Sequence, residues 1–142
     1  NVFFNISHSG DYVVCAVSDR EIGIDIEKRA KARMEVAGRF FHGEEVAQLK
    51  MLEEDKQDQL FFNYWSVKES FLKYIGTGLT RPLNSFIVSF SGGDVSLFEG
   101  ENKLPLYVYA CPVDDGYACH VCCEYEELTG IHEIFLEEIT GC

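Results

Sequence analysis

Two acidic residues stand two positions apart in the stretch Ile22-Gly23-Ile24-Asp25-Ile26-Glu27. Isoleucine at every second position predicts a β-strand, which places the carboxylates of Asp25 and Glu27 on one face. Two negative charges a few ångström apart repel each other, so a cation should compensate them. Arg20, or the basic cluster from Lys28 to Arg33, could form ordinary ion pairs with them. Mg²⁺ is the alternative, because it is commonly held by one or two carboxylates together with substrate phosphates.

Another pair of charged residues, Glu69 and Lys73, stands one helical turn apart. The apolar residues around the pair recur with helical spacing, which predicts a helix over residues 61–75 that lies on a core and ends at Gly76. An exposed ion pair worth ~0.3–0.5 kcal/mol is the plain interpretation of this spacing. The functional interpretation is a catalytic acid or base beside a phosphate ligand, both held on a rigid element.

A histidine follows the first apolar segment, in Ser7-His8-Ser9-Gly10. By itself it is best explained as a turn histidine that donates to a backbone carbonyl. Its functional interpretation is a donor to a phosphate oxygen, helped by Ser9 and the backbone N–H groups around Gly10. The other three histidines have no partner at ligand spacing and are interpreted as structural.

The formal net charge of −12 argues against a nucleic-acid partner, which would require a basic footprint. The basic residues Lys28, Arg29, Lys31 and Arg33 are nevertheless bunched, and this arrangement suits an anionic ligand bound locally. No apolar run approaches the ~20 residues of a membrane-spanning helix, and no signal peptide is present, so no membrane partner is expected.

Six cysteines raise the question of zinc or disulfides. Four of them are Cys111, Cys119, Cys122 and Cys123, in a segment patterned as a hairpin. Successive side chains of a strand point to opposite faces, so Cys119 and Cys122 cannot reach one metal ion without a bulge. We therefore interpret these cysteines as small buried apolar residues. Reduced thiols favour a cytoplasmic location.

The remaining pattern predicts a single α+β domain over residues 1–142. Short strands are expected at 2–6, 12–17, 22–27, 86–90, 95–98, 106–110 and 117–125, and a second helix at 44–52. The run at 12–17 is continuously apolar and is expected to be buried on both faces. Residues 53–58 are expected to form a charged linker, and 131–139 could be strand or helix. Together these elements predict a mostly antiparallel sheet packed against helices.

Three motifs follow one another along the chain. They are Phe4-Asn5-Ile6-Ser7-His8-Ser9-Gly10, then Ile22-Gly23-Ile24-Asp25-Ile26-Glu27-Lys28, then Trp65-Ser66-Val67-Lys68-Glu69-Ser70-Phe71-Leu72-Lys73 with Gly76-Thr77-Gly78-Leu79. In this order and spacing they resemble the 4′-phosphopantetheinyl transferases, specifically the type that activates surfactin synthetase. The resemblance implies transfer of the phosphopantetheine arm of coenzyme A to a serine hydroxyl of an apo acyl or peptidyl carrier protein, with release of adenosine 3′,5′-bisphosphate.

The resemblance also implies roles for individual residues. Asp25 and Glu27 match strand carboxylates that bind Mg²⁺. Glu69 matches the helix carboxylate that completes the metal site, and it is the candidate base for the incoming serine. Lys73 matches the lysine that holds the pyrophosphate and steadies the leaving group.

Two further expectations come from the resemblance. Ser7 and His8 match residues that contact the coenzyme A phosphates. Members of this type are about two such modules long, with the active site between the halves, and this chain matches the connecting strand and the second half. We therefore expect it to need a second module, either its own N-terminal half or another copy.

Two further questions concern the surface on which a carrier protein docks and whether the chain is an enzyme or only a binding module. Carrier proteins are acidic around their serine, so docking is expected near Lys28 to Arg33 and Arg39. A module that binds coenzyme A or a carrier without chemistry is the alternative to the enzyme.

Overall fold

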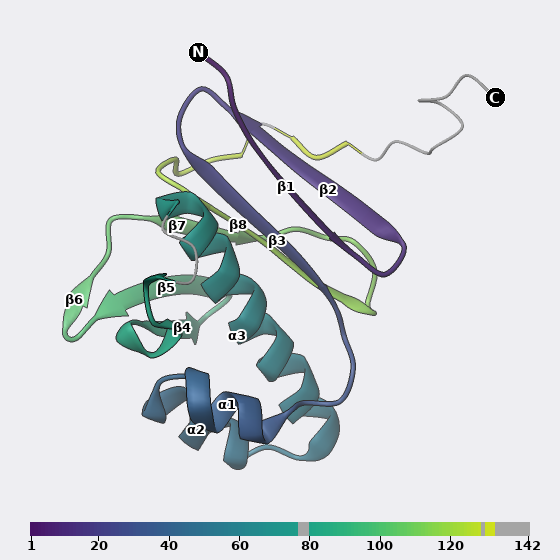
Figure 1. Cartoon of the computed structure of the whole chain (residues 1–142), viewed down its shortest axis with the longest axis vertical. Coiled ribbons are helices and arrows are strands. Elements are labelled where there is room, and N and C mark those ends of the chain that lie inside the picture. The colour runs from purple at the N-terminus through teal and green to yellow at the C-terminus, as the bar shows by residue number, and fades with distance from the viewer. Residues whose placement is uncertain (77–79, 129, 133–142) are drawn as a thin grey trace.

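The computed structural model describes residues 1–76, 80–128 and 130–132, and it has the α+β architecture that the sequence predicts (Figure 1). All of its strand pairs are antiparallel. The larger sheet has the strand order β3-β8-β7-β5-β4, with β6 beside β5. These strands are β3 (Ile22–Lys28), β8 (Tyr117–Cys123), β7 (Tyr107–Ala110), β5 (Asp94–Glu99), β4 (Ile87–Ser91) and β6 (Asn102–Lys103).

A separate hairpin is formed by β1 (Phe3–Ser9) and β2 (Tyr12–Ser18). Its tight turn uses Gly10 at a φ of 55°, a conformation that suits glycine. The expectation that 12–17 is buried on both faces is wrong, because Val13 and Val17 are 74% and 64% exposed. One face of β2 lies over the larger sheet, and nothing in the described residues covers the other.

Side chains rather than backbone groups join β1 to the edge of β3. Asn5 Oδ1, Ser7 Oγ and Ser9 Oγ accept hydrogen bonds from the backbone N–H groups of Ile24, Ile26 and Lys28 at 2.9, 3.1 and 2.9 Å. The acceptors stand at every second position of β1, so they share one face of the strand. The free edge of β3 is therefore satisfied by short polar side chains, and β1 is held beside Asp25.

The helices are α1 (Met34–Phe40), α2 (Gly43–Lys50) and α3 (Glu54–Ile75), with a short 3₁₀ turn η2 (Leu83–Ser85). A capping box starts α2, since His42 Nδ1 accepts from Glu44 N and Glu45 Oε1 accepts from His42 N. The charged linker expected at 53–58 is wrong, because α3 already begins at Glu54. Acidic residues in its first turn suit the helix dipole, and Gly76 ends it at a φ of 73°.

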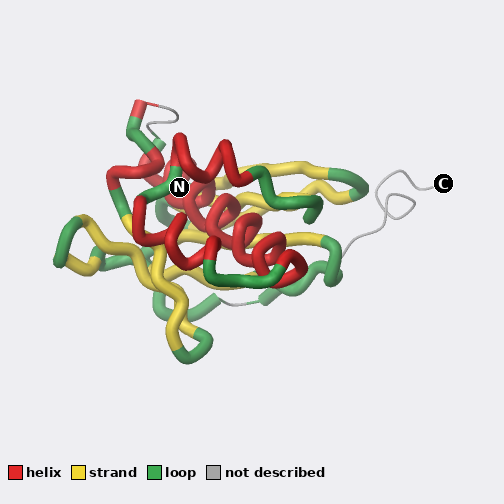
Figure 2. Tube along the Cα trace, turned by 90° about the horizontal axis from the view of Figure 1, so that it is seen from below, coloured by secondary structure: helices red, strands yellow, loops and turns green. Residues whose placement is uncertain are grey.

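The helix α3 crosses β3 and β8 (Figure 1). Figure 2, which views the molecule from the end that carries α1 and α2, shows the helices gathered against the strands. Gly23 permits this approach, because a Cβ atom there would lie 2.1 Å from Ser70 O and 2.5 Å from Tyr74 N of α3. The absence of a side chain at position 23 thus brings the β3 backbone next to the helix that carries Glu69 and Lys73.

Two apolar clusters lie on the two faces of the larger sheet. The cluster under the helices includes Phe61, Phe71, Phe86, Leu97 and Cys122. The cluster under the hairpin includes the three isoleucines of β3 with Tyr117, Cys119 and Val121. Cys119 and Cys122 therefore face opposite sides of β8, as the strand periodicity predicts. The segment expected at 131–139 lies mostly outside the described residues.

Candidate active site

Asp25 and Glu27 lie on the face of β3 that α3 covers. Asp25 is 5% exposed and Glu27 is half-buried. Burial and the neighbouring charge of Glu27 raise the pKa of Asp25 to about 9. Burial also raises the pKa of Glu27, although the Trp65 indole N–H and the charge of Lys73 oppose that rise. Burial is the main cause of both pKa shifts, and the charge of Glu27 adds to the shift of Asp25.

Glu69 reaches the same place from α3. Burial raises the pKa of its carboxyl group, the charge of Glu27 adds to the rise, and the charge of Lys73 opposes it. The neighbouring hydroxyl of Ser66 donates to the backbone oxygen of Asp25 at 3.1 Å, which fixes the helix against β3. The structure therefore brings together the three carboxylates that the sequence singles out, from one strand and one helix.

Lys73 lies one turn further along α3 and spans the gap between β1 and β3. Its Nζ donates to the backbone oxygens of Ile6 and Ile24 at 3.1 and 3.0 Å, and it lies 3.9 Å from Asp25 Oδ1. An ammonium group has three N–H donors, so one remains beyond the two carbonyl bonds. Lys73 is thus held rigidly beside the carboxylates with donor capacity to spare.

Ser7 and His8 point in opposite directions. The Ser7 side chain is buried, and its Oγ donates to Asp25 Oδ1 at 3.4 Å while it accepts from Ile26 N. His8 lies on the exposed face of the hairpin, opposite Val13 in the register. The structure therefore brings Ser7 to the carboxylates and does not bring His8 there.

The residues of this site fit a hard cation. Asp25 Oδ2 is buried and has no hydrogen-bond partner within the described residues. Carboxylate oxygens are the ligands that Mg²⁺ prefers, and a cation would stabilise the charged form of carboxyl groups whose pKa values are raised mainly by burial. In residues 1–76, 80–128 and 130–132, no group of three or more His, Cys, Asp or Glu side chains forms a ready-made metal centre. Asp25, Glu27 and Glu69 are candidate ligands by their chemistry and mutual electrostatic influence, but they do not form a preformed three-carboxylate centre in the described residues.

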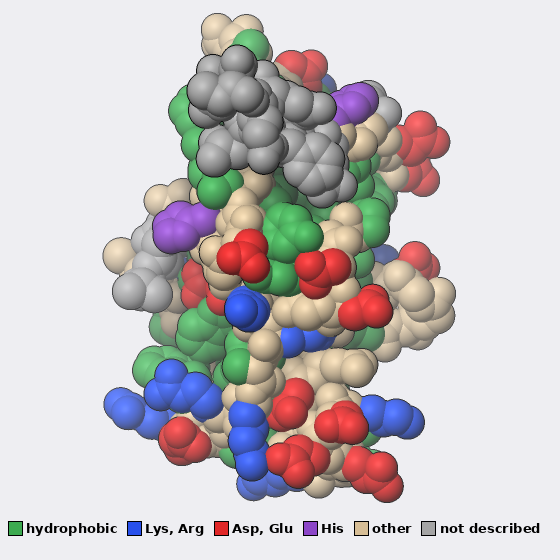
Figure 3. All heavy atoms as spheres, turned by 90° about the vertical axis from the view of Figure 1, so that its right-hand side faces the viewer, with side chains coloured by type: hydrophobic (Ala, Val, Ile, Leu, Met, Phe, Trp, Pro, Cys, Tyr) green, Lys and Arg blue, Asp and Glu red, His purple; other side chains and the backbone are tan. Residues whose placement is uncertain are grey.

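The basic cluster is largely used within the protein. Lys31 pairs with Glu54 at 3.0 Å and Arg33 with Glu35 at 4.0 Å, while Arg29 bonds to neutral oxygens. Figure 3 agrees, since Lys and Arg side chains alternate with Asp and Glu at the lower end of the face that it shows. This part of the surface is therefore mixed in charge rather than uniformly basic.

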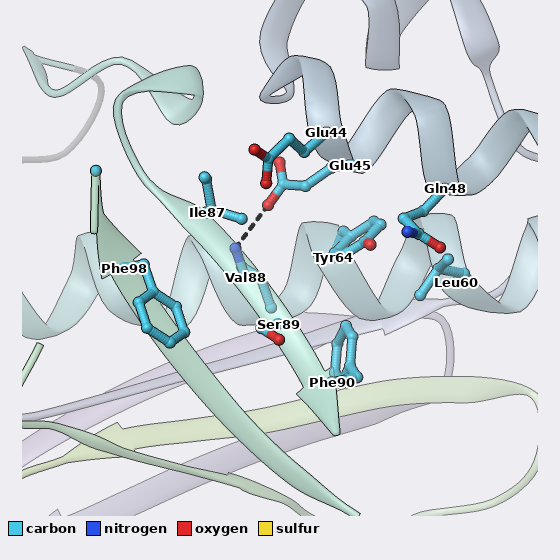
Figure 4. A pocket seen from close by; sticks show the side chains of 11 residues that line it. Glu44, Glu45, Gln48, Leu60, Tyr64, Ile87, Val88, Ser89, Phe90 and Phe98 are labelled. Atoms are coloured by element: carbon cyan, nitrogen blue, oxygen red, sulfur yellow. Dashed lines mark hydrogen bonds between the residues drawn. The ribbon is translucent and has the colours of Figure 1, made fainter. Parts of the chain in front are cut away.

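A buried ion pair between Glu45 and Lys68 was not anticipated from the sequence. Glu45 of α2 points toward β4 and accepts from Val88 N at 2.8 Å, beside a cavity of about 480 Å³ (Figure 4). Lys68 Nζ lies 2.9 Å from Glu45 Oε1 and donates to the backbone oxygens of Leu83 and Phe86. This pair joins α2, α3 and β4 behind the carboxylate site.

Comparison with known proteins decides the family. The family model of the 4′-phosphopantetheinyl transferase superfamily matches residues 21–122. The chain belongs to this superfamily. The matched span contains β3, all three helices and most of β8, and hence Asp25, Glu27, Glu69 and Lys73.

Individual transferases match over most of the chain. It is 42% identical over 138 residues to the 4′-phosphopantetheinyl transferase Sfp of Bacillus subtilis, covering 96% of this chain and 58% of that protein. It is 34% identical over 131 residues to the 4′-phosphopantetheinyl transferase gsp of Aneurinibacillus migulanus, covering 92% of this chain and 55% of that protein. The chain thus spans little more than half the length of these relatives.

The fold has a counterpart among solved structures. The crystal structure of Thermotoga maritima holo-[acyl-carrier-protein] synthase matches with a TM-score of 0.58 and 19% identity. The match covers 72% of this chain and 61% of that one. At this identity the likeness shows the fold alone. No helix in the described part of the chain is long and apolar enough to cross a membrane.

Proposed function

We propose that this chain transfers the 4′-phosphopantetheine arm of coenzyme A to a serine hydroxyl of an apo acyl or peptidyl carrier protein, as a cytoplasmic enzyme that uses Mg²⁺. The observation that carries the proposal is the convergence of Asp25, Glu27 and Glu69 beside the held ammonium group of Lys73. Carboxylates for a cation and a lysine for phosphate oxygens are what displacement at a pyrophosphate needs.

Each residue has a proposed role in the reaction. Asp25, Glu27 and Glu69 would hold Mg²⁺, which when bound neutralises charge on the pyrophosphate oxygens. The remaining N–H donor of Lys73 would bind the phosphate oxygen on the leaving side. Glu69 would accept the proton of the serine hydroxyl, directly or through a water molecule. A raised pKa makes the Glu69 carboxylate a better proton acceptor.

The bonds that form and break follow from these roles. The serine Oγ attacks the phosphorus that carries the pantetheine arm, and its proton passes to Glu69. The bond from that phosphorus to the bridging oxygen breaks, and adenosine 3′,5′-bisphosphate leaves with the bond electrons. The negative charge that develops on the bridging oxygen faces Lys73. No covalent intermediate with the enzyme is needed.

Ser7 and His8 are proposed to serve coenzyme A in different ways. The Ser7 hydroxyl is engaged with Asp25 and Ile26, so we assign it to positioning Asp25 as well as to the phosphate side of the site. His8 is on the opposite face of β1 and would meet coenzyme A only along the outer side of the hairpin. The loss of activity in Ser7→Ala should therefore exceed that in His8→Ala.

The active enzyme is proposed to contain a second module. Two observations support this: the matched region spans only 58% and 55% of the two transferases named above, and one face of the hairpin is apolar and exposed. That hairpin face consists of Val2, Phe4, Ile6, Val13, Cys15 and Val17, whose cross-strand pairs Phe4–Val17 and Ile6–Cys15 make it continuous. Exposed apolar patches of this kind mark interaction sites.

Carrier docking is proposed near Lys28 to Arg33 and Arg39. The guanidinium group of Arg39 lies 5.4 Å from the ring centre of Phe40, which is 44% exposed. A cation on an exposed aromatic ring suits a carrier helix with acidic and apolar side chains. Because Lys31 and Arg33 are paired with glutamates, Arg39 with Phe40 should contribute most, and Arg39→Glu should raise the carrier KM.

The transfer is tested by mass spectrometry of apo fatty-acid, polyketide and peptide carrier proteins incubated with coenzyme A and Mg²⁺. A mass gain of one phosphopantetheine group, abolished by EDTA and by Asp25→Asn or Glu69→Gln, is expected. If two copies of the chain must assemble to form the active enzyme, the activity rises more steeply than in proportion to the enzyme concentration. Such a dependence would indicate that the missing module is a second copy. Full activity in both carboxylate variants would refute the assigned site, and tight coenzyme A binding without any turnover would indicate a binding module.

A further inference from the structure

A second cavity, of about 250 Å³, lies at the end of the larger sheet between α3 and the β4–β5 hairpin. Its polar lining residues are Arg29, Asn63 and His120, and its apolar walls include Phe90, Val95 and Tyr117. None of the described residues that line it belongs to the carboxylate site. His120 stands opposite Asp25 in the β3–β8 register, so the cavity lies next to the carboxylate site while it has polar groups of its own.

The guanidinium group of Arg29 forms no salt bridge within the described residues, although the charge of Asp115 acts on it at longer range. It donates to Tyr117 O, Gln59 O and Asn63 Oδ1 at 3.2, 3.0 and 3.1 Å, all of which are neutral oxygens. No carboxylate in the described residues lies within salt-bridge distance of it. Guanidinium has five N–H donors, so two remain available. A half-buried, permanently charged group that has free donors and no carboxylate in direct contact favours a bound anion.

Two further polar groups converge on the same space. His120 is 4% exposed, and its Nδ1 has no hydrogen-bond partner within the described residues. Asn63 uses its oxygen to hold Arg29, while its amide nitrogen donates no hydrogen bond within the described part of the chain. Buried polar atoms are normally satisfied, so the orphaned Nδ1 of His120 beside a charged group indicates a ligand oxygen.

The size and the walls of the cavity restrict the ligand. At ~30 Å³ of liquid volume per water molecule, 250 Å³ corresponds to about eight non-hydrogen atoms. Asp115 already balances part of the Arg29 charge at longer range, so the cavity suits an anion of no more than one charge. Phosphate or sulfate would place some of its oxygens against apolar walls, where a polar group without a partner is unfavourable. A carboxylate with a short hydrocarbon chain matches both ends of the cavity.

We propose that this cavity is a binding site for a short-chain monocarboxylate, whose carboxylate group is held by Arg29, Asn63 and His120 and whose hydrocarbon chain lies against Phe90 and Val95. A ligand bound in this cavity contacts the end of β3, the helix α3 and the β4–β5 hairpin, and so links these elements. The candidate transferase residues lie on β3 and α3, and β4 packs behind them. The proposal itself does not depend on the transferase activity.

The test titrates the full 142-residue chain with butyrate by calorimetry, in the absence of coenzyme A and Mg²⁺. NMR of the side-chain amide of Asn63 locates the binding. Saturable binding of one butyrate per chain is expected, with no comparable binding of butanol, chloride or inorganic phosphate at equal ionic strength. Phosphate that binds as tightly as butyrate, or butyrate that gives no saturable response, overturns the proposal.

Two variants and a control separate this site from general charge effects. Arg29→Gln removes the cation, and His120→Phe removes the orphaned nitrogen and fills the cavity. Each should weaken butyrate binding at least about tenfold. Arg20→Gln is the matched control, since Arg20 forms a surface pair with Glu124, and it should leave binding unchanged. Circular dichroism establishes that each variant is folded. Binding that is unchanged in folded Arg29→Gln contradicts the proposal even if His120→Phe fails to fold.

Discussion

The Lys68 ammonium group lies 2.9 Å from the carboxylate of Glu45, and both side chains are almost fully excluded from solvent, at 0% and 1% exposed. All three N–H donors of Lys68 and both carboxylate oxygens of Glu45 have partners. Glu45 also accepts from His42 N and Val88 N, and Lys68 donates to two backbone oxygens. The pair therefore fixes the rotation of α3, because Lys68 points to α2 while the next residue, Glu69, points to β3.

Removing one partner should destabilise the protein strongly. Lys68→Met leaves Glu45 charged and buried without a cation, which costs about 3–5 kcal/mol in comparable pairs. Denaturant unfolding followed by circular dichroism measures the loss in the free energy of unfolding. Adding Glu45→Gln to Lys68→Met should restore part of the stability, because the buried charge disappears while an acceptor for Val88 N remains.

A surface pair supplies the control for that measurement. Lys31 and Glu54 are paired at 3.0 Å with side chains that are 80% and 67% exposed. Lys31→Met should therefore change the free energy of unfolding by less than about 1 kcal/mol. A Lys68→Met protein as stable as Lys31→Met would show that the buried pair does not hold α3.

The close approach at Gly23 should be equally sensitive. Gly23→Ala adds a Cβ atom 2.1 Å from Ser70 O, so α3 must move away from β3. Overpacking of this kind costs about 1–3 kcal/mol, and the shift should also reduce transfer activity, since Glu69 and Lys73 move with the helix. Unfolding free energy and kcat are both measured. Gly38→Ala is the matched control, because it lies in α1 with open space around its Cα and should stabilise by ~0.5–1 kcal/mol.

Much of this arrangement could be predicted from the sequence because it is periodic. Isoleucine at every second position of β3 places Asp25 and Glu27 together, and the i, i+4 spacing in α3 places Glu69 and Lys73 together. The Glu45–Lys68 pair could not be predicted in this way. Periodicity shows that Lys68 and Glu69 face different directions, but their partners come from distant parts of the chain. A lysine in the middle of the apolar stripe of a helix is the signal that could have indicated it.

The exposure of β2 was mispredicted for a related physical reason. An apolar run shows that a strand can be buried on both faces, while its actual burial depends on which elements pack there. Val13 and Val17 belong to the face that no described residue covers. The polar residues of β1 were also assigned only to a ligand, whereas Ser7 and Ser9 satisfy the edge of β3. Both differences arise from tertiary contacts that local patterns do not contain.

Burial of His120 should make stability depend on pH. Burial, together with the charge of Arg29, lowers the pKa of His120 from 6.5 to about 4. The unfolded chain then binds the proton more readily, so this contribution to stability is complete above pH 6.5 and is lost as the pH falls toward 4. The loss amounts to at most about 3 kcal/mol. Urea unfolding at several pH values measures it.

The variant that isolates this effect is His120→Phe. Its free energy of unfolding should vary less between pH 6.5 and 4 than that of the wild-type protein, because the buried titrating group is gone. His132→Gln is the control, since its side chain is exposed, and it should keep the wild-type pH profile. Parallel profiles for wild type and His120→Phe would show that His120 does not contribute to acid destabilisation.

The single tryptophan offers a direct measurement of metal binding. The indole N–H of Trp65 lies near enough to Glu27 to lower the pKa of its carboxyl group, so a cation bound by the carboxylates should alter the fluorescence of Trp65. Titration with Mg²⁺ in the presence of coenzyme A should give a saturable change that EDTA reverses.

Asp25→Asn and Glu69→Gln should each weaken the apparent affinity for Mg²⁺ at least about tenfold, because each removes a charged oxygen ligand. Glu44→Gln, an exposed glutamate of α2, should bind Mg²⁺ as the wild-type protein does. Equal affinity in Asp25→Asn, Glu69→Gln and wild type would exclude these carboxylates as ligands, whatever the transfer activity.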